Sequence, residues 1–256
     1  MPEIEIILVL IIVAFFSGLI DAAVGGGGLI QVPGIFSALP NEVPATNFGI
    51  NKFSSICGTT MAVRQYLRRV KLPWGLMLPA MICAFSASFV GAMVVSIIPV
   101  HLMKPIILGL LIFMAIYTLI KKDFGSIQKP LVVTRREKIG AAALGAATGF
   151  YDGVFGPGAG SFMSFLFVRF FAFDFLHAAA AARVVNFMTN LAALSFFIPT
   201  GHIIWMYALP MAACNMAGGV LGARVAIKGG VRLIRILFLC LMSVLITRFA
   251  YDVFFK

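Results

Sequence analysis

Cations placed deep inside apolar segments are the residues of this sequence best suited to chemistry. Lys52 and Arg183 each interrupt a long uncharged run, and each belongs to a polar stripe. Side chains three and four residues apart share one helix face. The stripes are Lys52, Ser55 and Thr59, with Asn51 beside them, and Arg183, Asn186 and Asn190. A cation at membrane depth costs several kcal/mol unless it is solvated or paired, so both cations are candidates for attracting an anion.

Two glycine-rich stretches, each following an aspartate, form the second chemical feature. The first has Gly25, Gly26, Gly27 and Gly28 after Asp21, and the second has Gly156, Gly158 and Gly160 after Asp152. Such runs do not continue a stable helix, so they predict broken or re-entrant helices. A helix that begins after such a break turns its free N–H groups and positive dipole end toward the cavity, which favours an anion.

Both features have structural alternatives. Glycines also let helices pack closely in membranes, a use that fits Gly145, Gly149 and Gly153 on one segment and Gly218 and Gly222 on another. The two cations either flank a central cavity or form ion pairs with the two aspartates that hold the halves of the chain together. The aspartates are also candidates for carrying a coupling proton, because burial disfavours the charged form of a carboxylate.

The segments that carry these residues are too apolar for a water-soluble domain. Of the 256 residues, 61% are hydrophobic and 11% charged, with a mean hydropathy of +1.05, whereas soluble domains carry about 25% charged residues. Several continuous apolar runs reach the ~17–25 residues that a membrane-spanning helix needs. The predicted fold class is therefore an all-α polytopic membrane protein. The net charge of +11 lies in short loops rather than on a face suited to nucleic acid.

An internal repeat organises the chain. Adding 131 to a residue number in the first half gives its partner in the second, so that Trp74 corresponds to Trp205 and Gly91 to Gly222. We predict a first repeat over residues 1–120, a basic cytoplasmic linker over 121–138 and a second repeat over 139–256. The expected apolar segments are about 4–23, 28–40, 45–67, 72–98 and 102–120, then about 139–154, 158–172, 176–198, 203–226 and 232–253. The sequence leaves open whether the glycine-interrupted pairs cross the membrane twice or form re-entrant hairpins.

Equivalent loops of the two repeats carry opposite charge bias. Residues 64–71 contain four basic side chains, whereas the equivalent residues 195–202 contain no Lys or Arg. Residues 99–103 are almost uncharged, whereas the equivalent region carries Arg224, Lys228, Arg232 and Arg235. Because basic loops stay cytoplasmic, this bias predicts inverted-topology repeats with a site between them, as in many secondary transporters. If all ten segments span, it also places both termini outside.

No cofactor or metal site is predicted. Cys57, Cys83, Cys214 and Cys240 lie in apolar segments without metal-binding spacing. The chain also lacks the HExxH and GxSxG motifs, so an enzyme is not expected.

The paired glycine motifs resemble those of the sulfite exporter TauE/SafE family, and most closely its YfcA-like permeases. They read GLIDAAVGGGGLIQVPGIF at 18–36 and GFYDGVFGPGAGSF at 149–162, and the likeness continues through INKF at 50–53 and GARV at 222–225. The resemblance implies a multi-pass permease of the bacterial cytoplasmic membrane that moves small anions such as sulfite or organosulfonates, by alternating access between the repeats. The alternatives are a passive anion channel and a permease for a small carboxylate without sulfur. The expected partners are the lipid bilayer and a small anion; proton coupling, transport direction and homo-oligomerisation stay open.

Overall fold

The computed structural model describes residues 3–120 and 133–228, together with isolated positions between 236 and 251. Every regular element in these residues is a helix, and no strand occurs among them. The predicted all-α fold class is therefore confirmed. Most of the predicted linker, residues 121–132, and nearly all of the predicted tenth segment, about 232–253, lie outside the described residues.

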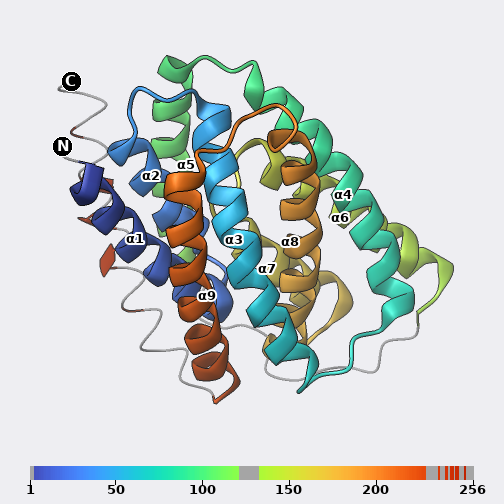
Figure 1. The fold of residues 1–256 in the computed structure, drawn as a ribbon. Helices are drawn as coiled ribbons and strands as arrows, with labels where there is room; N and C mark the ends of the chain where they lie inside the picture. The colour runs from blue at the N-terminus through green and yellow to red at the C-terminus, as the bar shows by residue number, and fades with distance from the viewer. Residues whose placement is uncertain are drawn as a thin grey trace.

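Nine helices make up the described ranges (Figure 1). They are α1 (Glu3–Val24), α2 (Gly28–Ala38), α3 (Pro44–Leu67), α4 (Trp74–Ser96), α5 (Val100–Ile120), α6 (Arg135–Val154), α7 (Ala159–Phe171), α8 (Phe175–Phe197) and α9 (Trp205–Ile227). Helix α6 begins before the predicted boundary at residue 139, because Thr134 and Glu137 form a capping box at its start. The hydrogen bond from Thr134 holds the pKa of the Glu137 carboxyl below its usual value.

The predicted repeat reappears in the helix boundaries. An offset of 131 places α4 on α9 residue for residue, and it aligns the first residues of α2 with α7 and of α3 with α8. The breaks at 25–27 and 155–158 also overlap under this offset, the second being one residue longer at its start. Each copy therefore contains a helix, a glycine-rich break, a short helix and two long helices in the same order.

The first helix of each copy packs along the fourth helix of the other copy. Helix α1 lies along α9, and α6 lies along α4. A Cβ atom at Gly222 would lie 2.0 Å from the Leu19 carbonyl oxygen, and one at the equivalent Gly91 would lie 2.7 Å from the oxygen of Phe150. Leu19 and Phe150 are themselves separated by the repeat offset. The backbones of the two copies thus approach through equivalent contacts.

The glycines assigned to close helix packing occupy such contacts. Cβ atoms at Gly145, Gly149 and Gly153 would lie 2.2, 2.5 and 2.3 Å from backbone oxygens of α4. The same substitution at Gly218 would bring a Cβ to 2.1 Å from the Phe15 oxygen of α1. The predicted packing role of these glycines, and of Gly222, is therefore confirmed.

Equivalent helices run in opposite directions. In Figure 1, α3 descends and α8 ascends, so that the α3–α4 connection lies at the lower end and the α8–α9 connection at the upper end. The basic α3–α4 connection, the start of α6 and the end of α9 share the lower end. An inverted repeat requires this antiparallel relation, and the grouping matches the charge bias of the loops. The orientation of the copies in a membrane stays a prediction.

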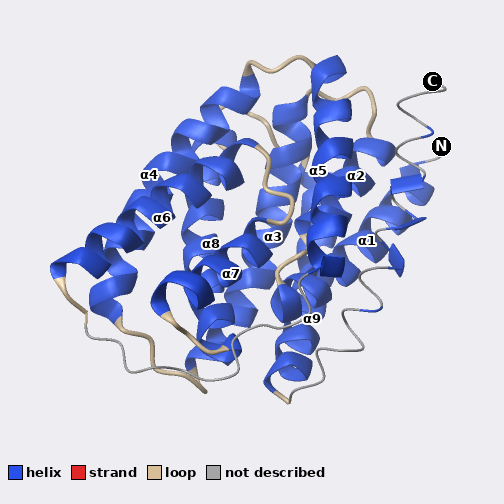
Figure 2. Ribbon diagram, turned by 180° about the vertical axis from the view of Figure 1, so that it is seen from behind, coloured by secondary structure: helices blue, strands red, loops and turns tan. Residues whose placement is uncertain are grey.

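The helices differ in their capacity to cross a bilayer. Within the described residues, α1, α4 and α8 are long and apolar enough to span one. Helices α2 and α7 have 11 and 13 residues, which corresponds to about 16 and 20 Å against a hydrocarbon core of ~30 Å. Figures 1 and 2 show α2 returning toward the end where α1 begins, and α7 returning toward the end where α6 begins. The two glycine breaks are thus the tips of hairpins that enter from opposite ends.

Candidate functional site

The tips of the two hairpins touch. The backbone N–H of Ser161 donates to the Gly25 carbonyl oxygen at 2.8 Å, and the Ser161 hydroxyl donates to the Val24 oxygen at 2.8 Å. Gly25 and its equivalent Gly156 have φ values of +88° and +79°, a region that side chains other than glycine rarely adopt. The predicted helix breaks are therefore confirmed, and they meet each other inside the protein.

Gly25→Ala is expected to destabilise the protein more than Gly156→Ala. Positive φ costs an alanine about 1–2 kcal/mol at either position. A Cβ at Gly25 would additionally lie 2.4 Å from the Ser161 nitrogen, whereas at Gly156 the nearest atom, Asp152 Oδ1, is 3.5 Å away. Thermal unfolding of the two variants in the same detergent measures the difference. Equal losses would contradict the tight contact between the hairpin tips.

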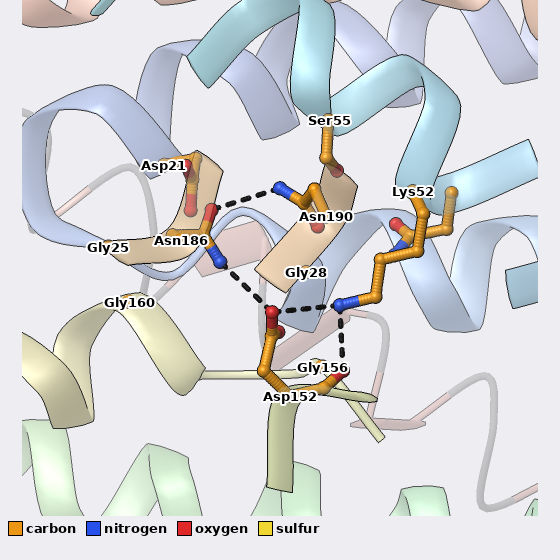
Figure 3. Close-up of a pocket in the computed structure, with 11 residues that line it drawn as sticks. Asp21, Gly25, Gly28, Lys52, Ser55, Asp152, Gly156, Gly160, Asn186 and Asn190 are labelled. Atoms are coloured by element: carbon orange, nitrogen blue, oxygen red, sulfur yellow. Dashed lines mark hydrogen bonds and ion pairs between the residues drawn. The ribbon is translucent and has the colours of Figure 1, made fainter. Parts of the chain in front are cut away.

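A polar cavity lies between the hairpin tips and the two polar stripes (Figure 3). About 310 Å³ of space not filled by protein atoms lies there, a volume that includes open solvent at the mouth. Its lining comes from both copies: Asp21, Gly25, Gly28, Asn51, Lys52 and Ser55 from the first, and Asp152, Gly156, Gly160, Asn186 and Asn190 from the second. Most of the residues singled out from the sequence are thus brought together around one space.

Five of the predicted residues lie outside this lining. Gly26 and Gly27 belong to the first hairpin tip, and Gly158 precedes α7 with a φ of +77°. The Thr59 hydroxyl donates to the Asn186 side-chain oxygen at 3.4 Å, so it supports a lining residue. The fifth is Arg183, whose guanidinium lies behind two lining glycines: a Cβ at Gly25 or Gly160 would come within 2.6 or 2.5 Å of its Nη2.

Lys52 forms a buried ion pair with Asp152 of the other copy. The Lys52 ammonium lies 2.9 Å from Asp152 Oδ2, with side-chain exposures of 1% and 2%, and it donates to the Asp152 carbonyl oxygen at 2.7 Å. Asn186 Nδ2 donates to the same Oδ2 at 3.3 Å, and the Thr189 hydroxyl also donates to it. Figure 3 shows Lys52 and Asp152 pointing toward each other. Three side chains therefore hold one carboxylate.

Arg183 forms the equivalent pair with Asp21 of the first copy. Its Nη1 lies 2.5 Å from Asp21 Oδ2, and the Gly27 backbone N–H donates to Asp21 Oδ1 at 3.3 Å. The Arg183 side chain is 1% exposed, whereas that of Asp21 is 21% exposed. The Nε atom of Arg183 is buried without a hydrogen-bond acceptor. This pair is therefore more accessible and less completely bonded than the pair formed by Lys52.

The two ion pairs set the electrostatics of the cavity. Both join one copy to the other, and the repeat offset relates them to each other. Two cations face two carboxylates, so these four groups carry no net charge when all are ionised. The sequence interpretations in which the cations flank a cavity and in which they pair with the aspartates thus describe the same arrangement. An anion that enters must compete with a carboxylate for its cation.

Sequence reasoning missed several polar residues next to the site. Asn215 of α9 donates to the Gln31 side-chain oxygen at 2.8 Å, and both residues are buried. The phenol of Tyr66 donates to the Ala22 oxygen at 2.7 Å, close enough to the Asp21–Arg183 pair to interact with both charges. Isolated amides within apolar segments were the available signal for Gln31 and Asn215. The position of Tyr66, whose repeat partner is Phe197, carried no such signal.

His177 has a local partner rather than a place in the cavity. Asp174 accepts a hydrogen bond from the His177 backbone N–H at 2.8 Å and contacts the ring Nδ1 at 2.8 Å. Asp174 precedes the first residue of α8, so this contact caps the helix start.

Comparison with known proteins identifies the group to which the chain belongs. The family model described as sulfite exporter TauE/SafE matches residues 10–249. This chain belongs to the TauE/SafE family. Its resemblance to that family is therefore confirmed, and the chain is a membrane protein of a transporter family.

Several named relatives extend over almost the whole length of the chain. "Probable membrane transporter protein ORF9" of Sinorhizobium sp. is 32% identical over 244 residues, which cover 95% of this chain and 92% of that protein. A "Probable membrane transporter protein" of Haemophilus influenzae is 31% identical, with coverages of 97% and 96%. "Probable membrane transporter protein YfcA" of Escherichia coli K12 is 30% identical, with coverages of 95% and 89%. No solved structure matches the chain.

Proposed function

We propose that this protein is a multi-pass secondary transporter of the bacterial cytoplasmic membrane that moves small anions, of the sulfite or organosulfonate class, by alternating access. One observation carries the proposal: at the meeting point of two half-length helices, the buried Lys52 lines a cavity, and the buried Arg183 lies behind its lining and pairs with the lining residue Asp21. The TauE/SafE family membership supports the substrate class. The relatives named as membrane transporters support the transport activity.

The cavity supplies donors suited to an anion. Helices α2 and α7 begin at the hairpin tips beside it, so their free N–H groups and positive dipole ends favour negative charge there. The Lys52 ammonium and the amides of Asn51, Asn186 and Asn190 line the same space. An oxyanion such as a sulfonate or a carboxylate accepts charge-assisted bonds from such groups.

The relation between the copies supports alternating access. Each ion pair crosses between the copies, and each first helix packs on the other copy. When two opposed copies of one unit surround a site, movement of one against the other opens the site to either side in turn. We propose that the copies are inverted in the membrane, with the basic lower end of Figure 1 facing the cytoplasm.

Flux measurements with the purified protein in proteoliposomes test the proposal. We expect uptake of radiolabelled sulfite or sulfoacetate well above that of protein-free vesicles, and little uptake of taurine, whose charges cancel. Acetate uptake alone would point to a small carboxylate without sulfur as the substrate. Single-channel currents in a planar bilayer would show that the protein is a passive channel and not a carrier. No flux of sulfite, sulfoacetate or acetate would overturn the proposed function.

A further inference from the structure

We infer that Asp21 is the exchangeable counter-ion of the site: it takes up one proton and releases Arg183, and the transported anion occupies its place on the guanidinium. The inference rests on the proposed function, because it assigns a proton to the same anion site. It also separates the roles of the two ion pairs. The Asp21–Arg183 pair opens to bind substrate, and the Lys52–Asp152 pair stays closed.

The negative charge of an entering anion must be balanced by an added positive charge. Two carboxylates already neutralise the two cations of the cavity. An anion that reached Arg183 beside an ionised Asp21 would leave one guanidinium between two negative groups in a poorly solvated space, where an uncompensated charge is costly. Protonation of Asp21 removes that excess charge. A bound monoanion and one proton leave the net charge of the site unchanged.

The two aspartates are held unequally, and the sequence shows why. Asp152 is 2% exposed and accepts from Lys52, Asn186 and Thr189. In the first copy, the positions equivalent to Asn186 and Thr189 are occupied by the shorter Ser55 and by Gly58, which has no side-chain donor. Asp21 is 21% exposed and is held by Arg183 and the Gly27 N–H. Fewer bonds must break to release Asp21 than to release Asp152.

The guanidinium has the geometry to receive the anion. Arg183 binds Asp21 through Nη1, and its buried Nε has no acceptor. Planar guanidinium groups bind carboxylate and related oxyanions through two parallel N–H bonds. An anion in place of the Asp21 carboxylate gains the Nη1 donor and the Gly27 N–H, the two groups that now bind Asp21. Both donors suit a sulfonate or a carboxylate, so measured flux must show which of the two is transported.

The surroundings of Asp21 single it out as the proton carrier. Arg183 faces it from α8, and Tyr66 interacts with it from α3 while donating its own hydroxyl to Ala22. Helices α2 and α9 present a pair of amides near the same end of α1, Gln31 and Asn215, neither of which titrates. Lys52 and Asp152 lie across the cavity and bond each other. Among these groups, Asp21 is the carboxylate that is both partly exposed and bonded to the substrate-binding cation.

The pH dependence of anion binding tests the inference. If binding takes up one proton, the Kd for methanesulfonate rises about tenfold per pH unit wherever Asp21 is ionised in the anion-free protein. Methanesulfonate suits this test because it is a sulfonate that carries one negative charge throughout the range from about pH 6 to 9. In Asp21→Asn, whose amide imitates the protonated acid, we expect a Kd that does not vary with pH. Glu42→Gln, at a carboxylate between α2 and α3, is the matched control and keeps the wild-type slope.

Proton movement gives a second readout in the same vesicles. A pH-sensitive dye inside wild-type proteoliposomes should report acidification as sulfoacetate, or else sulfite or acetate, enters. In Asp21→Asn, anion exchange should continue while the accompanying proton flux falls at least tenfold. Anion flux without proton flux in the wild type, or an unchanged proton flux in Asp21→Asn, would overturn this inference and leave the proposed function standing. No flux of the three anions in the wild type would overturn both. If Asp21→Asn fails to fold, the pH dependence of the wild-type Kd and the wild-type proton flux still test whether anion binding takes up a proton.

Discussion

Asp152→Asn is expected to lower the stability of the protein by about 3–5 kcal/mol, the usual effect of removing one partner of a buried ion pair. The change leaves the Lys52 ammonium, 1% exposed, without its counter-ion. Adding Lys52→Met removes that unpaired charge and should restore most of the lost stability, because an apolar replacement of a buried ion pair is often neutral. Thermal unfolding followed by intrinsic fluorescence in detergent compares the three proteins.

The comparison has a control at the start of α8, outside the cavity. Asp174 and His177 form a contact with 28% and 20% exposed side chains, so Asp174→Asn should cost at most about 1 kcal/mol, mainly through the helix cap. The double variant, although stable, should transport no anion because it lacks a cation and its carboxylate in the cavity. A single Asp152→Asn variant as stable as the wild type would show that Lys52 and Asp152 are not a buried pair in the folded protein.

Arg183→Lys is expected to reduce anion flux at least about 30-fold, even though it keeps the positive charge. Losing a buried charged hydrogen bond costs about 2–5 kcal/mol, and 1.4 kcal/mol corresponds to a factor of ten. The lysine ammonium is a compact point charge and cannot present the fixed, planar donors of a guanidinium. Gly25 and Gly160 leave room for the guanidinium and for no larger group, since Cβ atoms there would nearly touch Nη2. Initial rates of sulfoacetate uptake measure the effect.

Arg169→Lys is the matched control for this substitution. Arg169 is exposed near the end of α7 and does not line the cavity, so the same chemical change there should leave flux within about twofold of the wild type. Gel filtration and thermal unfolding establish that both variants are folded. Wild-type flux in Arg183→Lys would show that transport does not need the planar guanidinium, and wild-type flux in Arg183→Ala would show that Arg183 is not part of the site.

The sequence predicts the architecture well because the repeat is strict. The partner relation between Trp74 and Trp205 anticipated helices α4 and α9, which coincide residue for residue. Glycine and proline chemistry anticipated the breaks after Val24 and Val154, since such residues do not continue a helix. The spacing of Lys52 and Ser55 placed both on the face of α3 that lines the cavity. These features depend on local periodicity, which a sequence displays directly.

The pairing of charges could not be read from the chain. Spacing does not tell whether Asp21 pairs with Lys52 of its own copy or with Arg183 of the other, because the answer depends on how the copies interlock. The structure shows that each pair crosses between copies. The replacement of Thr189 by Gly58 in the first copy is visible in the sequence, but its meaning depends on the hydrogen bond from Thr189 to Asp152.

The exchanged packing of the first helices has a consequence for biogenesis. Helix α1 leaves the ribosome well before α9, the helix along which it packs, because most of the described chain lies between them. Until α9 has been synthesised, the small-residue face of α1 around Gly18 has no partner within the nascent chain. The insertion machinery or the lipid must therefore shelter this face through most of translation. The two repeats must therefore complete their folding together, because each packs its first helix on the other.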